Sequence, residues 1–325
     1  MTRLHVLMFF RANVIRGMKS LVGNRRWRLK EPSSERVERI LKELGCSRAF
    51  AKALAARAAD DPKKLLSSEL SDLHPPQALL GIPQAIERIA RALKCQEKIF
   101  IHGDFDVDGL TSAAVLYLGL KKLGFKELKV EIEDRERGHG LNLDVVCRVI
   151  AEKFQLLITA DCGVSDFECI TRLQQSGVDV IITDHHHVPE RLPPAIAIIN
   201  PKQQGCEYPN KDIAAVGVVF QLLRALYQHV GLSELEVHQF LDLVMLGTVA
   251  DLVPLTRNGQ VENKILVAQG LKLLAEGKAC LGLRVLIEKL SLNPKNLTAG
   301  ELSYIVVPKL NAANRVGDPR VAFLL

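Results

Sequence analysis

No stretch of this 325-residue sequence is apolar for long enough to cross a membrane as a helix. The apolar residues 4–10 are followed by Arg11 and Arg16 and not by a small-residue cleavage site, which argues against a signal peptide. The seven cysteines are scattered and form no CxxC pair, so we expect neither a disulfide framework nor a zinc knuckle. These absences predict a protein of the reducing cytoplasm with no membrane partner.

Most of the chain also lacks an excess of positive charge, although its formal net charge is +6. Residues 1–30 contain eight basic and no acidic residues, which leaves 35 basic and 37 acidic residues over 31–325. The basicity is therefore an N-terminal feature and argues little for nucleic-acid binding by the rest of the chain. The segment 1–30 is either a phosphate-binding arm or a disordered, solvated start, and Met18 is an alternative initiator.

The spacing of apolar residues divides the remaining chain into three parts. It predicts a helical lead-in over 31–95, an α/β core over 96–255 and a helical C-terminal part over 256–325. The expected strands are 99–102, 128–132, 156–159, 180–183 and 195–199. The expected helices from the core onward are 111–123, 141–153, 166–176, 213–230, 234–250, 262–275 and 281–289. This alternation predicts an α/β fold with a mostly parallel sheet flanked by helices.

Aspartates follow three of these predicted strands. The first strand ends in a segment with three of them, Asp104, Asp106 and Asp108, and the third and fourth strands are followed by Asp161 and Asp184. Because parallel strands end at one edge of a sheet, we expect these side chains to lie together. A further acid, Asp251, follows the apolar run 241–250, which is either a strand or a buried helix; its length favours a helix.

Carboxylates this close raise one another's pKa unless a cation lies among them. Mg²⁺ and Mn²⁺ prefer oxygen ligands, and the histidines at 185–187 add nitrogen donors. So many donors exceed the needs of one ion, which predicts two ions about 3.5–4 Å apart that activate water for phosphoryl displacement. Considered alone, each of these residues also has a purely structural interpretation. A lone aspartate at a strand end is commonly a helix cap, and His187 is best interpreted as a loop residue.

The order and spacing of these motifs resemble those of the DHH phosphoesterase superfamily. Asp184-His185-His186 matches its signature, and segments 102–109, 161–163 and 246–255 resemble its companion motifs. Within the superfamily the sequence is most similar to the RecJ-like exonucleases specific for single-stranded DNA. That resemblance runs from about residue 80 to the end, with supporting stretches at 138–142, 197–202 and 308–315.

The resemblance implies two bound ions, Mn²⁺ or Mg²⁺, and also implies which residues bind them. These are Asp104, Asp106, Asp108, Asp161, His185 and Asp251. Asp161 bridges the ions and acts in catalysis with His185 and His186, of which His186 faces the substrate phosphate. Asp184 orients a ligand histidine from outside the coordination sphere. His102 lies four residues before Asp106 and is either a further ligand or a packing residue.

Three more residues are candidates for holding the substrate. Arg135 contacts a phosphate or forms a surface ion pair with Glu133 or Glu136, and His139 stands where the family usually has tyrosine. Arg315 contacts DNA or caps a helix.

The implied function is hydrolysis of phosphodiester bonds in single-stranded DNA, in the 5′→3′ direction, during DNA repair and recombination. Single-stranded DNA is the expected partner, together with single-strand-binding and recombination or mismatch-repair proteins. The alternatives are a phosphoesterase for short oligonucleotides or nucleotides and a non-catalytic DNA-binding relative. The chain stops at Leu325, before the second lobe and OB-fold expected of the family, so we expect weak processivity.

Overall fold

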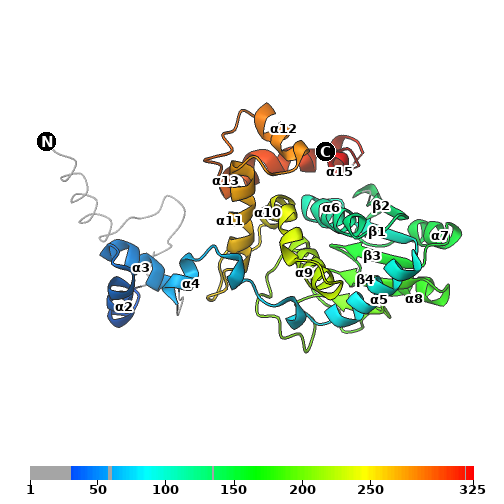
Figure 1. Ribbon diagram of the computed structural model, residues 1–325, viewed down its shortest axis with the longest axis horizontal. Helices are drawn as coiled ribbons and strands as arrows, with labels where there is room; N and C mark the ends of the chain where they lie inside the picture. Colours follow the sequence, from blue (N-terminus) through cyan, green and yellow to red (C-terminus); the bar gives the residue numbers. More distant parts are fainter. Residues whose placement is uncertain (1–30, 58–60, 134, 319) are drawn as a thin grey trace, which may run out of the picture. The chain divides into compact units, whose positions relative to one another are not determined.

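The computed structural model describes residues 31–57, 61–133, 135–318 and 320–325 (Figure 1). The chain divides into two compact units, Met1–Pro62 and Lys63–Leu325. In the first unit, α2 (Ser34–Leu44) and α3 (Arg48–Ala56) each begin after a serine whose hydroxyl accepts a backbone N–H of the first turn. The basic segment 1–30, predicted to be an arm or a disordered start, lies outside the described residues.

A five-stranded parallel sheet in the order β2-β1-β3-β4-β5 forms the centre of the second unit (Figure 1). The strands are β1 (Ile99–Gly103), β2 (Leu128–Ile132), β3 (Leu156–Ala160), β4 (Asp179–Thr183) and β5 (Ala197–Ile199). Strands β1 and β3 are buried on both faces, as parallel strands covered by helices are. The predicted α/β fold with a parallel sheet is confirmed.

Helices cover both faces of this sheet. On one face lie α7 (Leu143–Ala151) and α8 (Phe167–Gln175), which enclose a core that includes Phe100 and Leu157. Alternate residues of β1 face the other side, where α6 (Val107–Lys122) packs so closely that a side chain at Gly103 would meet Ala113. The remaining helices of this region are α5 (Ile82–Cys95), which packs on β5, and α9 (Ala215–His229), which packs on α6.

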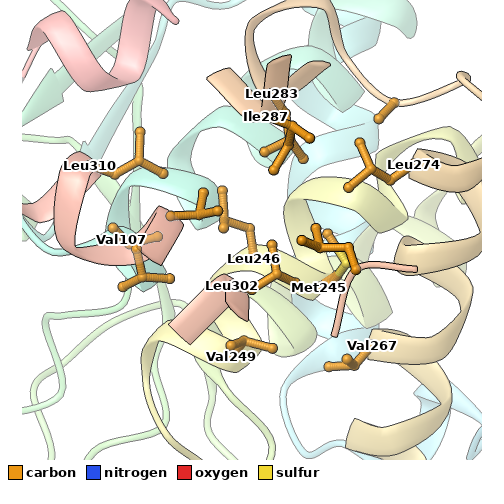
Figure 2. Packing of buried hydrophobic residues seen from close by; sticks show 14 residues of the cluster. Val107, Met245, Leu246, Val249, Val267, Leu274, Leu283, Ile287, Leu302 and Leu310 are labelled. Carbon is orange, nitrogen blue, oxygen red and sulfur yellow. The ribbon is translucent and has the colours of Figure 1, made fainter. Parts of the chain in front are cut away.

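The C-terminal part is helical, as expected, and has its own apolar core (Figure 2). That core joins Val107 at the start of α6 to Met245, Leu246 and Leu310. The helices involved are α10 (Leu241–Ala250), α11 (Glu262–Ala275), α12 (Leu281–Lys289), α13 (Ala299–Glu301), the π-helical turn η6 (Leu302–Val306), α14 (Val307–Val316) and α15 (Arg320–Leu324). Short helical segments precede α5: α4 (Pro62–Leu66), η1 (Leu70–Asp72) and η2 (Pro76–Ala78).

Two predicted helices differ from the structure by more than two residues at an end. The helix expected from residue 111 begins at Val107, because the Asp106 side chain caps its first turn by accepting the Gly109 N–H. The helix expected over 234–250 is divided into the turns η4 (Glu234–Glu236) and η5 (His238–Phe240) and helix α10. The run 241–250 before Asp251 is a helix, as its length indicated.

Within the described part of the chain, no helix combines the length and hydropathy needed to span a bilayer.

Candidate metal centre

The carboxyl ends of β1, β3 and β4 meet at one edge of the sheet. The chain passes from β1 to β2 on one side, and β3 then pairs on the other side of β1. Residues following β1 and β3 therefore flank the point where the strand order reverses, which is where open α/β sheets bind ligands. Topology alone thus brings Asp104, Asp161 and Asp184 to one place.

The loop after β1 aims its three aspartates in different directions. Asp104 Oδ1 accepts the N–H of Phe105 at 2.6 Å, and Asp106 caps α6. Asp108 is fully buried, and its two oxygens accept the first N–H groups of α9, from Ala215 at 2.8 Å and Val216 at 3.0 Å. A carboxylate is favoured there because the N-terminus of a helix carries partial positive charge.

Asp161 follows β3 in the left-handed backbone region, with φ at +70°. Residues other than glycine rarely adopt this conformation, and its cost is commonly found at functional sites. The Asp161 N–H donates to the Thr183 carbonyl at 2.9 Å, which holds the turn against β4. The side chain is 2 % exposed, and its Oδ1 has no hydrogen-bond partner in the part of the chain that the structure describes.

Asp184 organises the turn that follows β4. Its Oδ1 accepts the N–H groups of His185 at 2.7 Å and His186 at 2.9 Å, and its Oδ2 accepts the N–H of Val164 at 3.0 Å. The same Oδ1 lies 2.8 Å from His186 Nδ1, and this bond raises the pKa of the His186 imidazole. Asp184 therefore orients the ring of His186, whereas it holds His185 through the backbone.

His185 lies at the centre of the buried acids. Its Nε2 is 3.3 Å from Asp161 Oδ1, 3.6 Å from Asp251 Oδ2 and 3.9 Å from Asp108 Oδ2. No described residue forms a hydrogen bond with this nitrogen. Burial, together with the charges of His186 and Lys202, lowers the pKa of His185 to about 4. The imidazole is therefore neutral near pH 7, which is the form that binds metal ions.

The carboxylates of the site crowd one another. Burial and neighbouring acids raise the pKa of Asp108 and of Asp161 well above the usual range for aspartate. Burial and the charge of Asp106 raise the pKa of Asp251 to about 6. Buried donors without partners and repelling carboxylates are what a divalent cation would satisfy, so these residues fit a metal centre.

Among the described residues, four groups of three donors lie close enough together to share an ion. These are Asp104/Asp106/Asp161, Asp108/His185/Asp251, Asp161/His185/His186 and Asp104/Glu133/His139. All six aspartate and histidine ligands expected from the sequence are members of at least one group. His102 belongs to none of them; it is fully buried, and burial lowers its pKa to about 4.

The three residues predicted to bind substrate have different surroundings in the structure. His139 Nδ1 lies 3.3 Å from Asp104 Oδ2, and its ring stands 5.2 Å from the ring of His186. Arg135, in the short helical turn η3 (Arg135–Arg137), lies 5.9 Å from the centre of the Phe105 ring. Arg315 is exposed in the last turn of α14, where a cation favours the helix terminus.

Two residues of the site were not predicted from the sequence. Glu133 follows β2 and is buried, and burial with the neighbouring Asp104 raises its pKa to about 10. The signal was available, because β2 ends in an acid as β1, β3 and β4 do. Lys202, after β5, donates its ammonium to the His185 carbonyl.

Comparison with known proteins gives the family. Residues 98–248 match the DHH family, N-terminal domain. The single-stranded-DNA-specific exonuclease RecJ of Haemophilus influenzae is 41 % identical over 263 residues, which are 78 % of this chain and 45 % of that protein. The Bacillus subtilis RecJ is 35 % identical over 311 residues, 94 % of this chain and 38 % of that protein. The chain thus spans less than half the length of these curated relatives.

Solved structures agree with this result. RecJ from Thermus thermophilus in complex with Mn²⁺ superposes with a TM-score of 0.77 at 30 % identity, over 92 % of this chain and 42 % of that one. A second exonuclease RecJ, bound to manganese, gives a TM-score of 0.67 at 32 % identity, over 75 % of this chain and 60 % of that one. The chain therefore belongs to the DHH family, in which the RecJ exonucleases are its relatives.

Proposed function

We propose that this chain hydrolyses phosphodiester bonds of single-stranded DNA from the 5′ end, with two Mn²⁺ or Mg²⁺ ions in the centre described above. The supporting observation is that possible metal ligands from the segments after β1, β3, β4 and α10 meet at one edge of the sheet, and that Asp161 Oδ1 and both ring nitrogens of His185 are buried there without a hydrogen-bond partner among the described residues. The RecJ relatives supply the substrate class through their names, and the solved relatives were crystallised with Mn²⁺ or Mg²⁺.

The donor groups suggest how two ions would share the site. Asp104 and Asp106 with Asp161 would hold the first ion, and Asp108, His185 and Asp251 the second. Asp161 would reach both, since its Oδ1 lies 3.3 Å from the ring nitrogen of His185. When bound, such a pair lowers the pKa of a water molecule and stabilises the charge of an in-line displacement.

In this proposal His186 binds the substrate and is not one of the ligands of the two ions. Its side chain is 45 % exposed, and Asp184 holds its ring at a fixed orientation and favours the protonated form. An imidazolium beside the ions donates a hydrogen bond to a phosphate oxygen and balances its charge. The first turn of α6 and Arg135, whose guanidinium lies 5.9 Å from the centre of the Phe105 ring, would add positive potential near the loop after β1.

A nuclease assay tests this proposal. The substrate is a 5′-phosphorylated single strand labelled at its 3′ end, with duplex DNA and a dinucleotide alongside, in Mn²⁺ and in EDTA. We expect progressive shortening of the single strand in Mn²⁺ and at least a hundredfold loss of rate in Asp161→Ala. Asp144→Asn, an exposed change on α7, is the matched control and should retain the rate.

The products identify what is wrong if the proposal fails. Cleavage of the dinucleotide alone would indicate a short-substrate phosphoesterase. Absence of hydrolysis with metal still bound would indicate a non-catalytic relative. The repair role, the protein partners and the cytoplasmic location stay predictions.

A further inference from the structure

A separate donor group lies beside the centre, where β1 and β2 end. It consists of Asp104, from the loop after β1, and of Glu133 and His139, from the connection between β2 and α7. His139 Nδ1 lies 3.3 Å from Asp104 Oδ2 and 3.9 Å from Glu133 Oε2. The proposed function uses Asp104 but gives no role to Glu133, and it does not explain why these three side chains converge.

Glu133 has an unusual environment for a carboxylate. The residue is 3 % exposed, and neither side-chain oxygen has a hydrogen-bond partner among the described residues. The Gly140 N–H and the Asp104 carboxylate face it, but neither makes a bond of normal length and angle. Burying an unpaired carboxylate is costly, so native structures pair it with a cation or a proton.

We propose that Glu133 and His139 form a third divalent-cation site with Asp104, a ligand that this ion would share with the first ion of the proposed reaction. Ligand atoms about 2.0–2.2 Å from one ion lie about 3.0–3.5 Å from each other. The separations of 3.3 Å and 3.9 Å are close to this range, and a small rotation of the half-exposed His139 completes it. Two carboxylates and one imidazole suit Mn²⁺ or Zn²⁺.

The open side of this site faces the substrate side of the centre. His139 is 48 % exposed, and its ring packs edge-on against that of His186 at 5.2 Å. An ion held by three protein donors keeps coordination positions free for water or for a phosphate oxygen. The third ion would therefore bind a phosphate group of the DNA strand next to the one that His186 contacts.

The competing explanation is a proton shared between Glu133 and Asp104. Glu133→Gln separates the two possibilities, because an amide N–H can donate to Asp104 as a carboxylic acid would. The same amide is a poor ligand and carries no charge. A shared proton predicts that Glu133→Gln binds as many ions as the wild type, whereas a metal site predicts the loss of one.

The experiment counts Mn²⁺ ions bound per chain by equilibrium dialysis and elemental analysis, without DNA. We expect three ions in the wild type, two in Glu133→Gln and two in His139→Gln. Asp161→Ala should bind fewer ions than the wild type, because it removes a ligand of the reaction centre. The double variant Asp161→Ala with Glu133→Gln should bind one ion fewer than Asp161→Ala alone. This count remains informative if the proposed nuclease activity fails, since it requires no turnover.

An equal count in the wild type and Glu133→Gln would overturn the proposal. If Glu133→Gln does not fold, as judged by circular dichroism, His139→Gln decides the question, because a half-exposed side chain is removed with little effect on packing. An unchanged count in His139→Gln would then overturn it.

Discussion

Asp251→Asn should stabilise the metal-free protein while weakening its response to metal. Asp251 follows α10, with its side chain 25 % exposed and Oδ2 3.6 Å from the ring nitrogen of His185. Burial and the charge of Asp106 raise its pKa from 3.8 to about 6. Asparagine has nearly the same shape but carries no charge, so it removes the repulsion and also removes a ligand.

The sign and the size of the stability change follow from this pKa. Because the folded protein binds the Asp251 proton more tightly than the unfolded chain, the stability from this group is greatest below pH 3.8 and is lost as the pH rises through about 6. A difference of about two pH units is worth up to about 3 kcal/mol, at about 1.4 kcal/mol each. Asp251→Asn should therefore exceed the wild type by up to about 3 kcal/mol at pH 8 in EDTA.

Urea denaturation in EDTA and in Mn²⁺, at several pH values, measures this effect. The advantage of Asp251→Asn should shrink below pH 6, and its gain from Mn²⁺ should be smaller than that of the wild type, which is about 2.7 kcal/mol at a hundred times the dissociation constant. The control Asp144→Asn, exposed in the first turn of α7, should lose about 0.3–1 kcal/mol instead. A destabilised Asp251→Asn in EDTA at pH 8, or an advantage that persists in acid, would refute the reasoning.

Two further changes test packing, one beside the centre and one at the opposite edge of the sheet. Gly247→Ala should lower the free energy of unfolding by about 1–3 kcal/mol and weaken Mn²⁺ binding, because a Cβ there would lie 2.8 Å from Asp108 Oδ1. Gly300→Ala is its control in the same urea and dialysis measurements, since the nearest atom is 3.8 Å away. Arg88→Ala should lower the free energy of unfolding, measured by urea denaturation, by about 3–5 kcal/mol. The reason is that the buried Arg88 guanidinium on α5 pairs with Glu97 and with Asp179 of β4, which would lose their partner. Arg91→Ala, which removes an exposed pair, should cost about 1 kcal/mol or less, and equal losses for the two arginines would contradict this assignment.

Much of the fold could be predicted because its signals are local. Short apolar runs alternating with amphipathic stretches identified all five strands, and β2 (Leu128–Ile132) and α11 (Glu262–Ala275) have the predicted bounds. The start of α6 was missed by four residues, because the capping role of Asp106 competes with its interpretation as part of an acidic turn. The division of 234–250 was missed because an apolar pattern does not show where a helix is interrupted.

The candidate site was predictable in part. Parallel strands place their carboxyl ends on one edge, so the meeting of Asp104, Asp161 and His185 follows from the strand pattern once the sheet is parallel. Glu133 was overlooked as a site residue, although it too follows a strand. Its burial against Asp104 depends on the pairing of β2 beside β1, which no local pattern specifies.

The amino-acid sequence by itself determined the α/β class, the strand positions and the chemistry of the donors at the strand ends, because these depend on residue type and short-range spacing. Only the tertiary structure decided which donors meet. It joined Asp108 to the N-terminus of α9, brought Asp251 from the end of α10 to His185, and left His102 outside every donor group. The physical reason is that these contacts depend on how helices cross the sheet, and close approaches such as Gly247 against α6 set that crossing only in the folded chain.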